Sequence, residues 1–321
     1  MNQELVEPPL AVVALGGNAM QRPGGDDSVA ADFERTSETA KHLVAFASAG
    51  RRLVVTHGNG PQVGNHLLRS ELGVERGGLP YLPLDVCVAD TQGGMGYMLQ
   101  QSLTNAFHEA GLPAVVTSLV TQVIVDADDP AFDEPSKPVG EMISADKVDE
   151  FRRLGWKLNE DKARGGWRRV VASPNPTEIV EASAIRAMVA EGVIVVAAGG
   201  GGVPVVQDGR GRLSGAPAVV DKDLASALLA ADLKADALLI LTDVEKVSLD
   251  FGGPHERPLD HLTVTEAREL RDRGEFPAGS MGPKVEALCR FVEATGGTGV
   301  ITSIDRCVEA LDGETGTRIT P

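Results

Sequence analysis

Apolar and polar positions along this chain follow two alternating patterns. Short apolar runs bounded by glycine, asparagine or proline are typical of strands that are buried on both faces. Longer segments with an apolar residue at every third or fourth position predict amphipathic helices. Their alternation along 321 residues predicts an α/β fold with parallel strands, built as one large domain or as two lobes. The expected strands are 11–15, 53–56, 114–125, 193–198, 218–220, 237–244 and 298–303, and the expected helices include 32–49, 84–110, 144–154, 177–191, 224–231, 263–273 and 306–311.

Two successive strands end in loops of glycine and asparagine. The first run stops at Gly16-Gly17-Asn18, and the second continues into His57-Gly58-Asn59-Gly60-Pro61. Glycine lets the backbone approach a ligand and turn its N–H groups outward, and parallel strands deliver such loops to the edge where α/β sheets bind ligands. We therefore predict a composite site for a small anion, in which Asn59 adds an amide donor. The alternatives are a plain strand-to-helix turn at Gly16-Gly17 and, for His57, either a packed structural histidine or a catalytic one.

Two further glycine-rich loops have the same character. Gly199 to Gly202, with Gly200 and Gly201 at its centre, follows a buried strand and suits a phosphate close to the backbone, with a flexible hinge as the alternative. Ala278-Gly279-Ser280-Met281-Gly282 precedes a helix for which Ser280 is the expected N-cap. Lys284 then lies near a helix N-terminus, where a cation is unfavourable unless an anion is bound. This position predicts a phosphate beside Lys284.

Lysine is scarce in the chain, which has nine lysines and twenty-one arginines. A lysine inside a Gly/Pro-rich loop is therefore a candidate for ligand binding, and Lys137, Lys222 and Lys284 fit that description. Lys222 and Asp223 are expected to form a charge pair where a strand becomes a helix. Lys137 lies on a stiff extended segment because prolines flank it, and a solvated loop lysine is the alternative.

The composition changes between two parts of the predicted sheet. Aspartate, proline and glycine are frequent in roughly 127–176, which also contains both tryptophans, so we predict a small flap-like subdomain there. The long helix 84–110 carries an apolar face and three glycines. Glycines allow close approach of another helix, so this helix is expected to pack in an interface, for instance between subunits, with cofactor contact as the alternative.

Composition and charge narrow the class of protein. A 42% hydrophobic content and a mean hydropathy of −0.04 are typical of globular proteins. The net charge of −16 argues against nucleic acid or an anionic membrane as partner, and no apolar run has the length of a membrane span. Residues 1–9 lack a basic region, so we expect a short ragged tail and no signal peptide. Three widely spaced cysteines without a CxxC predict a reduced, cytoplasmic environment and no protein-held metal cluster.

Several motifs for competing chemistries are missing from the sequence. The dipeptide Gly-Lys does not occur, which excludes a P-loop, and no G-x-G-x-x-G follows a predicted strand, which argues against a dinucleotide dehydrogenase. H-E-x-x-H and G-x-S-x-G are absent as well. Zinc hydrolases and serine hydrolases therefore have no support in the sequence.

The chain closely resembles the carbamate kinases of the amino-acid-kinase superfamily, nearly from end to end. The resemblance rests on many motifs in one order: Leu-Gly-Gly-Asn-Ala (15–19), His-Gly-Asn-Gly-Pro-Gln-Val-Gly-Asn (57–65), Pro-Leu-Asp-Val-Cys-Val-Ala (83–89), Thr-Gln-Gly (91–93), Pro-Ser-Lys-Pro-Val-Gly (135–140), Gly-Trp-Arg-Arg-Val-Val (166–171), Gly-Gly-Gly-Gly-Val-Pro-Val (199–205), Val-Asp-Lys-Asp (220–223) and Gly-Ser-Met-Gly-Pro-Lys (279–284). Residues 159–165 and the tail before Pro9 match less well.

The resemblance implies a three-layer α/β/α sandwich with an open, mainly parallel central sheet and a small protruding flap subdomain. It implies an N-terminal lobe (1–205) that binds carbamate or carbamoyl phosphate, with the flap at about 127–176, and a C-terminal nucleotide-binding lobe (206–321). The implied reaction is reversible phosphoryl transfer between ATP and carbamate, with Mg²⁺ required, and the implied assembly is a homodimer. Carbamate is already an anionic nucleophile, so such a reaction needs no general base.

The resemblance also assigns roles to individual residues. Lys222 and Lys284 match phosphate-binding lysines, Asp223 the carboxylate that orients them, and Lys137 a flap lysine. Related kinases carry a lysine before the first Gly-Gly, where this chain has Ala14-Leu15, so Lys137 is expected to take that cationic role. Asp243, where a glycine is expected, and Gly282, where a bulkier residue is common, depart from the pattern of the nucleotide pocket. The implied substrate-binding residues are Gly16, Gly17, Asn18, Gly58, Asn59, Gly60, Gly200 and Gly201, and the implied ATP- or ADP-binding residues are Thr242, Asp243, Gly279, Ser280 and Met281.

Two other functions remain open at the level of the sequence. One is a different kinase of the superfamily that phosphorylates an acyl carboxylate such as acetylglutamate. The other is a non-catalytic sensor of a nucleotide or metabolite on the same fold, against which the intact set of lysines argues.

Overall fold

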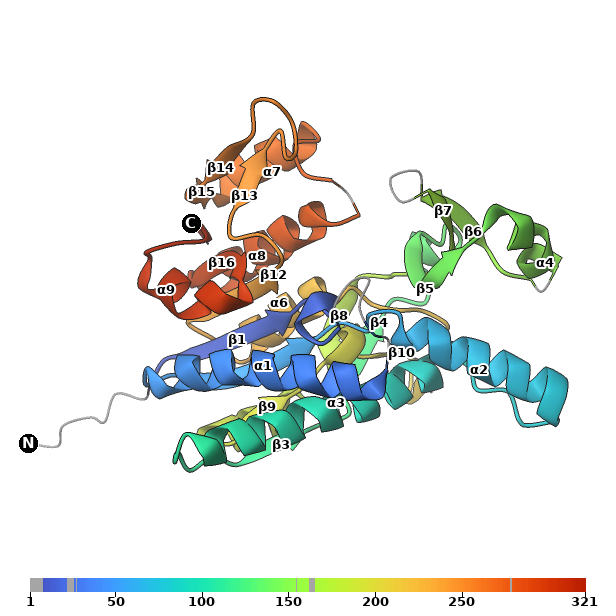
Figure 1. The fold of residues 1–321 in the computed structure, drawn as a ribbon, viewed down its shortest axis with the longest axis horizontal. Helices are drawn as coiled ribbons and strands as arrows, with labels where there is room; N and C mark the ends of the chain where they lie inside the picture. The colour runs from blue at the N-terminus through green and yellow to red at the C-terminus, as the bar shows by residue number, and fades with distance from the viewer. Residues whose placement is uncertain (1–7, 22–25, 27, 154, 162–164, 278) are drawn as a thin grey trace, which may run out of the picture.

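The computed structural model describes residues 8–21, 26, 28–153, 155–161, 165–277 and 279–321. Most of the expected tail, Met1–Glu7, and Ala278 of the fourth glycine-rich loop therefore lie outside the described residues. Figure 1 shows the fold from the side of the long helix α3 (Leu84–Glu109), with the last strands and helices above it.

A central sheet of eight strands confirms the expected α/β class. Its order is β15-β17-β16-β12-β1-β2-β9-β3, and all neighbours from β16 to β3 run parallel. β17 is antiparallel to β16 and parallel to β15, so one edge of the sheet is reversed. The strands are β1 (Leu10–Leu15), β2 (Arg52–His57), β3 (Val116–Ser118), β9 (Ile194–Val196), β12 (Ala237–Thr242), β15 (His261–Thr263), β16 (Thr298–Ser303) and β17 (Thr317–Thr320).

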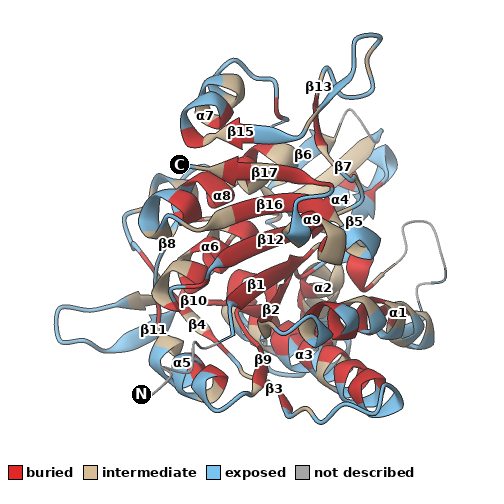
Figure 2. Cartoon of the chain, turned by 90° about the vertical axis from the view of Figure 1, so that its left-hand side faces the viewer, coloured by how far each residue is buried: buried red, intermediate tan, exposed pale blue. Residues whose placement is uncertain are grey.

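Helices cover both faces of this sheet, which gives the three layers. Successive side chains of a strand point to opposite faces: Val13 packs with the helices of one layer, and Val12 with those of the other. Both side chains are fully buried, as are most residues of the central strands in Figure 2. The first layer contains α1 (Val29–Ser48), α3 and α9 (Cys307–Asp312), and the second contains α5 (Ala182–Ala190), α6 (Lys222–Asp232), α7 (Val264–Asp272) and α8 (Met281–Thr295).

A second sheet accounts for most errors of the sequence-based assignment. The expected strand 114–125 is two strands, because β3 joins the central sheet and β4 (Gln122–Val125) joins the order β11-β10-β4-β8. The expected helix 177–191 starts as strand β8 (Pro176–Ile179) and becomes helical only at α5. The expected strand 218–220 is reduced to a single bridge between Ala218 and Ala172. The remaining strands of this sheet are β10 (Val203–Gln207) and β11 (Leu213–Gly215), and β13 (Val247–Leu249) pairs with β14 (Arg257–Leu259) in a separate hairpin.

A small antiparallel sheet protrudes from the main body within the segment expected to form the flap. Its order is β5-β7-β6, and it carries the short helix α4 (Val148–Arg153). Figure 1 shows this subdomain beside α2 (Gln62–Gly77), away from the central strands. The two approach so closely that a Cβ on Gly64 of α2 would lie 2.2 Å from the Cα of Gly140. The strands are β5 (Lys137–Ile143), β6 (Leu158–Asp161) and β7 (Gly166–Val171).

None of the helices in the described ranges is both long enough and apolar enough to cross a membrane.

Candidate active site

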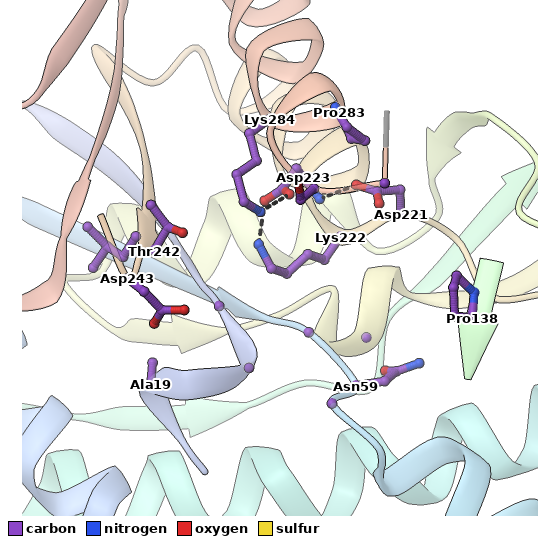
Figure 3. A pocket seen from close by; sticks show the side chains of 18 of the residues that line it. Ala19, Asn59, Pro138, Asp221, Lys222, Asp223, Thr242, Asp243, Pro283 and Lys284 are labelled. Atoms are coloured by element: carbon purple, nitrogen blue, oxygen red, sulfur yellow. Dashed lines mark hydrogen bonds and ion pairs between the residues drawn. The ribbon is translucent and has the colours of Figure 1, made fainter. Parts of the chain in front are cut away.

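A cavity of about 540 Å³ opens where the central parallel strands end. The loops after β1, β2 and β12 line it, and the N-termini of α6 and α8 and the start of β5 complete its wall. Figure 3 shows the lysine side chains of these two helices extending into this space. Of the residues assigned from the sequence, those that line the cavity are Gly16, Gly17, Gly58, Asn59, Gly60, Lys137, Gly200, Lys222, Asp223, Thr242, Asp243, Gly279, Ser280 and Lys284.

One buried carboxylate holds two of the three lysines. Asp223 is 3% exposed, and its Oδ2 accepts a hydrogen bond from Lys284 Nζ at 2.8 Å while its Oδ1 accepts one from Lys222 Nζ. Lys222 and Asp223 come from the first turn of α6, and Lys284 comes from the first turn of α8. Two ammonium groups that start on different helices are thereby fixed side by side at the wall of the cavity.

The pKa directions reflect this shared ion cluster. Burial alone would raise the pKa of the Asp223 carboxyl, but Lys222 and Lys284 outweigh it and hold that pKa well below its usual range. Burial lowers the pKa of Lys222, and Asp223 offsets only part of that effect. Burial would also lower the pKa of Lys284, yet the Asp223 carboxylate raises it overall. Asp223 is therefore ionised at neutral pH, and it provides the negative charge that keeps a cation stable at the start of α8. The expectation that Lys284 needs a bound phosphate for that purpose is wrong.

The third lysine reaches the same cluster from the protruding subdomain. Lys137 Nζ lies 2.5 Å from Asp221 Oδ2. Asp221 is also the N-cap of α6, because its Oδ1 accepts hydrogen bonds from the backbone N–H groups of Asp223 and Leu224. Burial would raise the pKa of Asp221, but Lys137 outweighs it and lowers that pKa. Lys137 is therefore an ion-paired lysine of the cavity wall and not a solvated loop lysine.

The glycines at the strand ends make room for neighbouring groups. A Cβ on Gly58 would lie 3.2 Å from Cδ of Lys222, so the stem of this lysine passes directly over the loop after β2. A Cβ on Gly16 would lie 3.0 Å from the carbonyl oxygen of Leu241 in the adjacent strand. The N–H of Gly16 donates to that same oxygen at 3.2 Å. This amide is used by the sheet, which corrects the expectation that it turns toward a ligand.

Two of the assigned residues lie outside the cavity lining, a third makes no capping bond, and the side chain of a fourth is not described. Gly201 is buried behind Gly200, and a Cβ there would lie 2.3 Å from the oxygen of Val220. Met281 begins α8 and packs against the main core instead of lining the cavity. Ser280 occupies the N-cap position of α8, but its side chain makes no capping hydrogen bond. Asn18 lies in a short 3₁₀ helix, Gly17–Ala19, and its side chain is outside the described part of the structure.

His57 is a packed residue at the end of β2. It is 1% exposed, its Nδ1 lies 2.9 Å from the carbonyl oxygen of Gly58, and its Nε2 faces Gly199, where a Cβ would lie 2.4 Å away. Burial lowers the pKa of His57 to about 4, so the ring is neutral at neutral pH. This environment favours the structural interpretation of His57.

Sequence reasoning missed three charged residues of the cavity wall. Asp221 carried a recognisable signal, because aspartate directly before a helix is a preferred N-cap. Asp305 lies just after β16, at the edge of the sheet where the sequence predicts the ligand. Arg35 faces the cavity from α1 and pairs with Glu38 at 3.0 Å, and nothing in the local pattern distinguishes it from other helix arginines.

The cavity is suited to binding an anion that replaces a carboxylate as the partner of a lysine. Each of the three lysines at the cavity is already paired with a carboxylate, two with Asp223 and one with Asp221. Among the described residues, no group of three or more His, Cys, Asp or Glu side chains is arranged to hold a metal ion. The wall of the cavity therefore presents ammonium groups beside the carboxylates that pair with them.

The chain matches a known protein family over most of its length. The model of the amino acid kinase family matches residues 9–303. The carbamate kinase of Pyrococcus horikoshii is 44% identical over 315 residues, which is 98% of this chain and 100% of the relative. Carbamate kinase-like protein YahI of Escherichia coli is 45% identical over 312 residues, 97% of this chain and 98% of the relative. The solved structure of carbamate kinase from Giardia lamblia bound to AMP-PNP is 40% identical, covers 98% of both chains and has a TM-score of 0.89. The chain belongs to the amino acid kinase family and, within it, to the carbamate kinase group.

Proposed function

We propose that this kinase transfers a phosphoryl group reversibly between ATP and carbamate, so that ADP and carbamoyl phosphate yield ATP and carbamate in the catabolic direction. The observation that carries the proposal is the Lys222–Asp223–Lys284 cluster, held at the wall of a cavity whose other side is formed by glycine-rich loops. The relatives named carbamate kinase, at 44% identity over nearly the whole chain, support the choice of substrate.

Charge neutralisation is the main task in such a reaction. Phosphoryl transfer through a loose transition state needs in-line positioning and stabilisation of negative charge, with no covalent intermediate on the protein. Two unit charges about 4 Å apart repel by about 4 kcal/mol at an effective dielectric constant near 20. Lys222 and Lys284 are placed to offset that repulsion at the transferred group, and Asp223 fixes their positions. No general base is required, which is consistent with His57 being packed out of the cavity.

The two substrates are assigned to different sides of the cavity. We assign the nucleotide to the lobe 206–321 through Thr242, Asp243, Gly279 and Ser280, and the structure of the Giardia lamblia enzyme bound to AMP-PNP supports nucleotide use. Carbamate or carbamoyl phosphate is assigned to the lobe 1–205, with Gly17, Asn59 and Gly60 at the base. Lys137 of the flap at about 127–176 then closes over this second substrate. The roles of Gly201, Met281 and Asn18 rest on the resemblance alone.

Magnesium fits the site as part of the nucleotide complex. The carboxylates Asp221 and Asp223 are occupied by lysines, so they do not form a ready-made cage for a metal. Mg²⁺ in kinases is commonly held by substrate phosphates, water and one or two carboxylates, and Asp243 and Asp305 are two further carboxylates that line the cavity. The ion would screen the phosphate charge that the lysines alone do not cover.

A homodimer is proposed for the assembly. The side of α3 that faces away from the core exposes Val86 and Tyr97, which are 36% and 55% exposed. These apolar groups suit a self-complementary contact across a two-fold axis. Light scattering coupled to gel filtration should give a mass near twice the 33.6 kDa of one chain, and a monomer at micromolar concentration would contradict the assignment.

One assay tests the proposed reaction. ATP formation from ADP and carbamoyl phosphate with Mg²⁺ should occur at a rate that disappears in the double variant Lys222→Ala/Lys284→Ala. In the forward direction, ADP release from ATP is measured with carbamate and with acetylglutamate. This second measurement distinguishes a carbamate kinase from a kinase that phosphorylates acetylglutamate. This comparison matters because a relative of similar identity, 45%, is named only as carbamate kinase-like. No ATP from carbamoyl phosphate, or faster ADP release with acetylglutamate, would overturn the proposal.

A further inference from the structure

Thr121 and Ala198 join two segments that cross together from the central sheet to the second sheet. β3 is followed by β4 and β9 by β10, and the neighbouring strands β3 and β9, like β4 and β10, run parallel. Thr121 directly precedes β4, and Ala198 directly precedes the glycine-rich loop 199–202 that leads to β10. The backbone N–H of Ala198 donates to Thr121 Oγ1 at 2.9 Å, and both residues are fully buried. This hydrogen bond fixes the start of the loop relative to β4.

The backbone of Ala198 is strained. Its φ is +48° and its ψ is +34°, a left-handed conformation that is sterically unfavourable for a residue with a Cβ. Among the described residues, the other non-glycine residues with a positive φ are Lys234 and Asp250, and both are exposed. A residue in this conformation persists only where its surroundings hold it, and such residues gather at functional sites. The bond from Thr121 is therefore a restraint on a strained turn.

Gln92 of α3 holds Thr121 in turn. Its Oε1 accepts the backbone N–H of Thr121 at 2.8 Å, and its Nε2 donates to the carbonyl oxygen of Thr121 at 3.0 Å. The Thr121 hydroxyl donates to the carbonyl oxygen of Leu119 at 2.9 Å, so its own oxygen is oriented to accept the N–H of Ala198. Gln92 is 3% exposed, so water does not compete for these bonds. The acceptor for Ala198 is thus fixed in place before any ligand binds.

The glycine-rich loop 199–202 touches two walls of the cavity. Gly200 lines the cavity, and a Cβ there would lie 1.4 Å from Asn59 Oδ1, in the loop after β2. A Cβ on Gly201 would lie 2.3 Å from the carbonyl oxygen of Val220, just before α6. Closely packed interiors transmit small displacements. A shift of the loop would therefore move the start of α6 or the loop after β2.

We infer that Thr121 is a positioning residue for phosphoryl transfer, although it does not line the cavity. By holding the turn at Ala198, it keeps the glycine-rich loop against the segment from which Lys222 starts. Without the hydroxyl, Ala198 would relax from the left-handed conformation, and Lys222 would lose its place beside the transferred group. The inference goes beyond the proposed function and rests on it for the reaction that is assayed.

Two substitutions of Thr121 test the role of its hydroxyl. Thr121→Val keeps the shape of the side chain and removes the hydroxyl, and Thr121→Ser keeps the hydroxyl. Steady-state kcat and KM are measured for ATP formation from ADP and carbamoyl phosphate with Mg²⁺. Thr121→Val should lower kcat about 10- to 100-fold, the scale for a small misplacement of a reacting group. The KM for ADP should stay within about threefold, because ADP is assigned to the wall with Thr242 and Asp243, and Thr121→Ser should keep the wild-type kcat within about threefold.

A second substitution separates positioning from a general loss of stability. In Thr121→Val/Ala198→Gly, glycine adopts the left-handed conformation without strain, so kcat should recover by at least about fivefold over Thr121→Val. Thr121→Val/Lys234→Gly is the matched control, since Lys234 has a φ of +52° but follows the far end of α6 and does not line the cavity. The control should raise the melting temperature over Thr121→Val, as Ala198→Gly does, without recovering kcat.

If Thr121→Val does not fold, Gln92→Met and Gln92→Met/Ala198→Gly provide the same comparison, because Gln92 holds the same turn through the backbone of Thr121. A kcat within threefold of the wild type in the variant that lacks the restraint would overturn this inference and leave the proposed function standing. Equal kcat with Ala198→Gly and with Lys234→Gly as the second substitution would do the same. A wild type that makes no ATP from carbamoyl phosphate would overturn both.

Discussion

Lys137 Nζ lies 2.5 Å from Asp221 Oδ2, and this ion pair joins the protruding subdomain to the first turn of α6. Both side chains are partly accessible, at 27% and 18%, whereas Asp223 at the centre of the neighbouring cluster is almost completely enclosed. Lys137 is therefore the lysine that can most readily leave its carboxylate for an anionic substrate. Asp221 must stay, because it also caps the helix that carries Lys222.

Two substitutions of Asp221 should distinguish its ion pair with Lys137 from its role as the N-cap of α6. Asparagine caps helices about as well as aspartate, whereas alanine does not. Asp221→Ala should therefore lower the free energy of unfolding by about 1 kcal/mol more than Asp221→Asn, although both remove the charge that faces Lys137. Urea denaturation of the two variants measures the difference. Equal losses would mean that the capping bonds do not stabilise α6.

Removing either lysine of the Asp223 cluster should strongly reduce turnover. Lys222→Ala or Lys284→Ala deletes one donor to the transferred group and should lower kcat by about 10²-fold or more. Lys246→Ala is the control, since Lys246 pairs with Asp260 at 2.6 Å outside the cavity. Steady-state assays with ADP and carbamoyl phosphate give the values. Rates within threefold of the wild type in both cavity variants would remove these roles.

The location of the site could be predicted from the sequence because it depends on local rules. Gly17, Asn59 and Thr242 each follow an apolar run, and the carboxyl ends of parallel strands meet at one edge. Lys137, Lys222 and Lys284 stand out because lysine is scarce and because each lies in a Gly/Pro-rich loop or at a helix start. These signals are contained within a few residues, so no knowledge of tertiary packing is needed.

The errors concern features that depend on distant residues. Whether Val116 and Val123 belong to one strand is decided by their partners, Ile194 in the central sheet and Pro204 in the second sheet. Ser280 has the composition of an N-cap, but the backbone around it forms a turn in which Gly282 bonds to Pro277. The partner of Lys284 is Asp223, 61 residues earlier in the chain. Such pairings follow from the fold and leave no local trace.

Loss of the flap lysine should affect one substrate more than the other. Lys137→Ala should lower kcat/KM for carbamoyl phosphate by about 10²-fold, while KM for ADP stays within about twofold, because Lys137 reaches the cavity from the subdomain proposed to close over carbamoyl phosphate. The control is Lys157→Ala, since Lys157 lies on the same subdomain outside the cavity, where its Nζ donates to the carbonyl oxygen of Asp133 at 3.4 Å. An unchanged kcat/KM for carbamoyl phosphate would contradict this role.

A side chain at position 200 should displace the Asn59 amide. Gly200→Ala brings a Cβ onto Asn59 Oδ1 and also strains a residue with a φ of +66°. Gly211→Ala is a matched control because its φ is +80° and no described atom outside its chain neighbours lies within 4 Å of where its Cβ would stand. Both should lose about 1–2 kcal/mol of stability from the backbone, but only Gly200→Ala should lose activity, by about 10-fold or more. Equal activity in the two variants would show that the Asn59 position is not critical.

The enclosure of His57 links stability to pH. Its folded-state pKa is about 4 because burial disfavours the charged ring, whereas an exposed histidine has a pKa near 6.5. Below pH 6.5 the unfolded chain therefore binds a proton at this position that the folded chain does not bind until about pH 4. The stability contribution of neutral His57 is fully present above pH 6.5 and is lost as the pH falls through that window. The low pKa of Asp223 affects stability in a different pH range. The stability that ionised Asp223 contributes is lost only as the pH falls below 3.8, the usual carboxyl pKa.

Between pH 6.5 and pH 4 the free energy of unfolding should fall by about 1.4 kcal/mol per pH unit on account of His57, or about 3 kcal/mol in total. Urea denaturation at half-unit steps measures the slope, and His57→Gln should reduce it by that amount because glutamine does not titrate. His66, whose pKa is also lowered by burial, adds a smaller slope that is present in both proteins and cancels in the comparison. If the variant is too unstable to study, the imidazole proton shifts of the folded wild type give an independent measurement. A His57 ring that titrates near pH 6.5 in the folded protein would show that it is not held neutral at the end of β2.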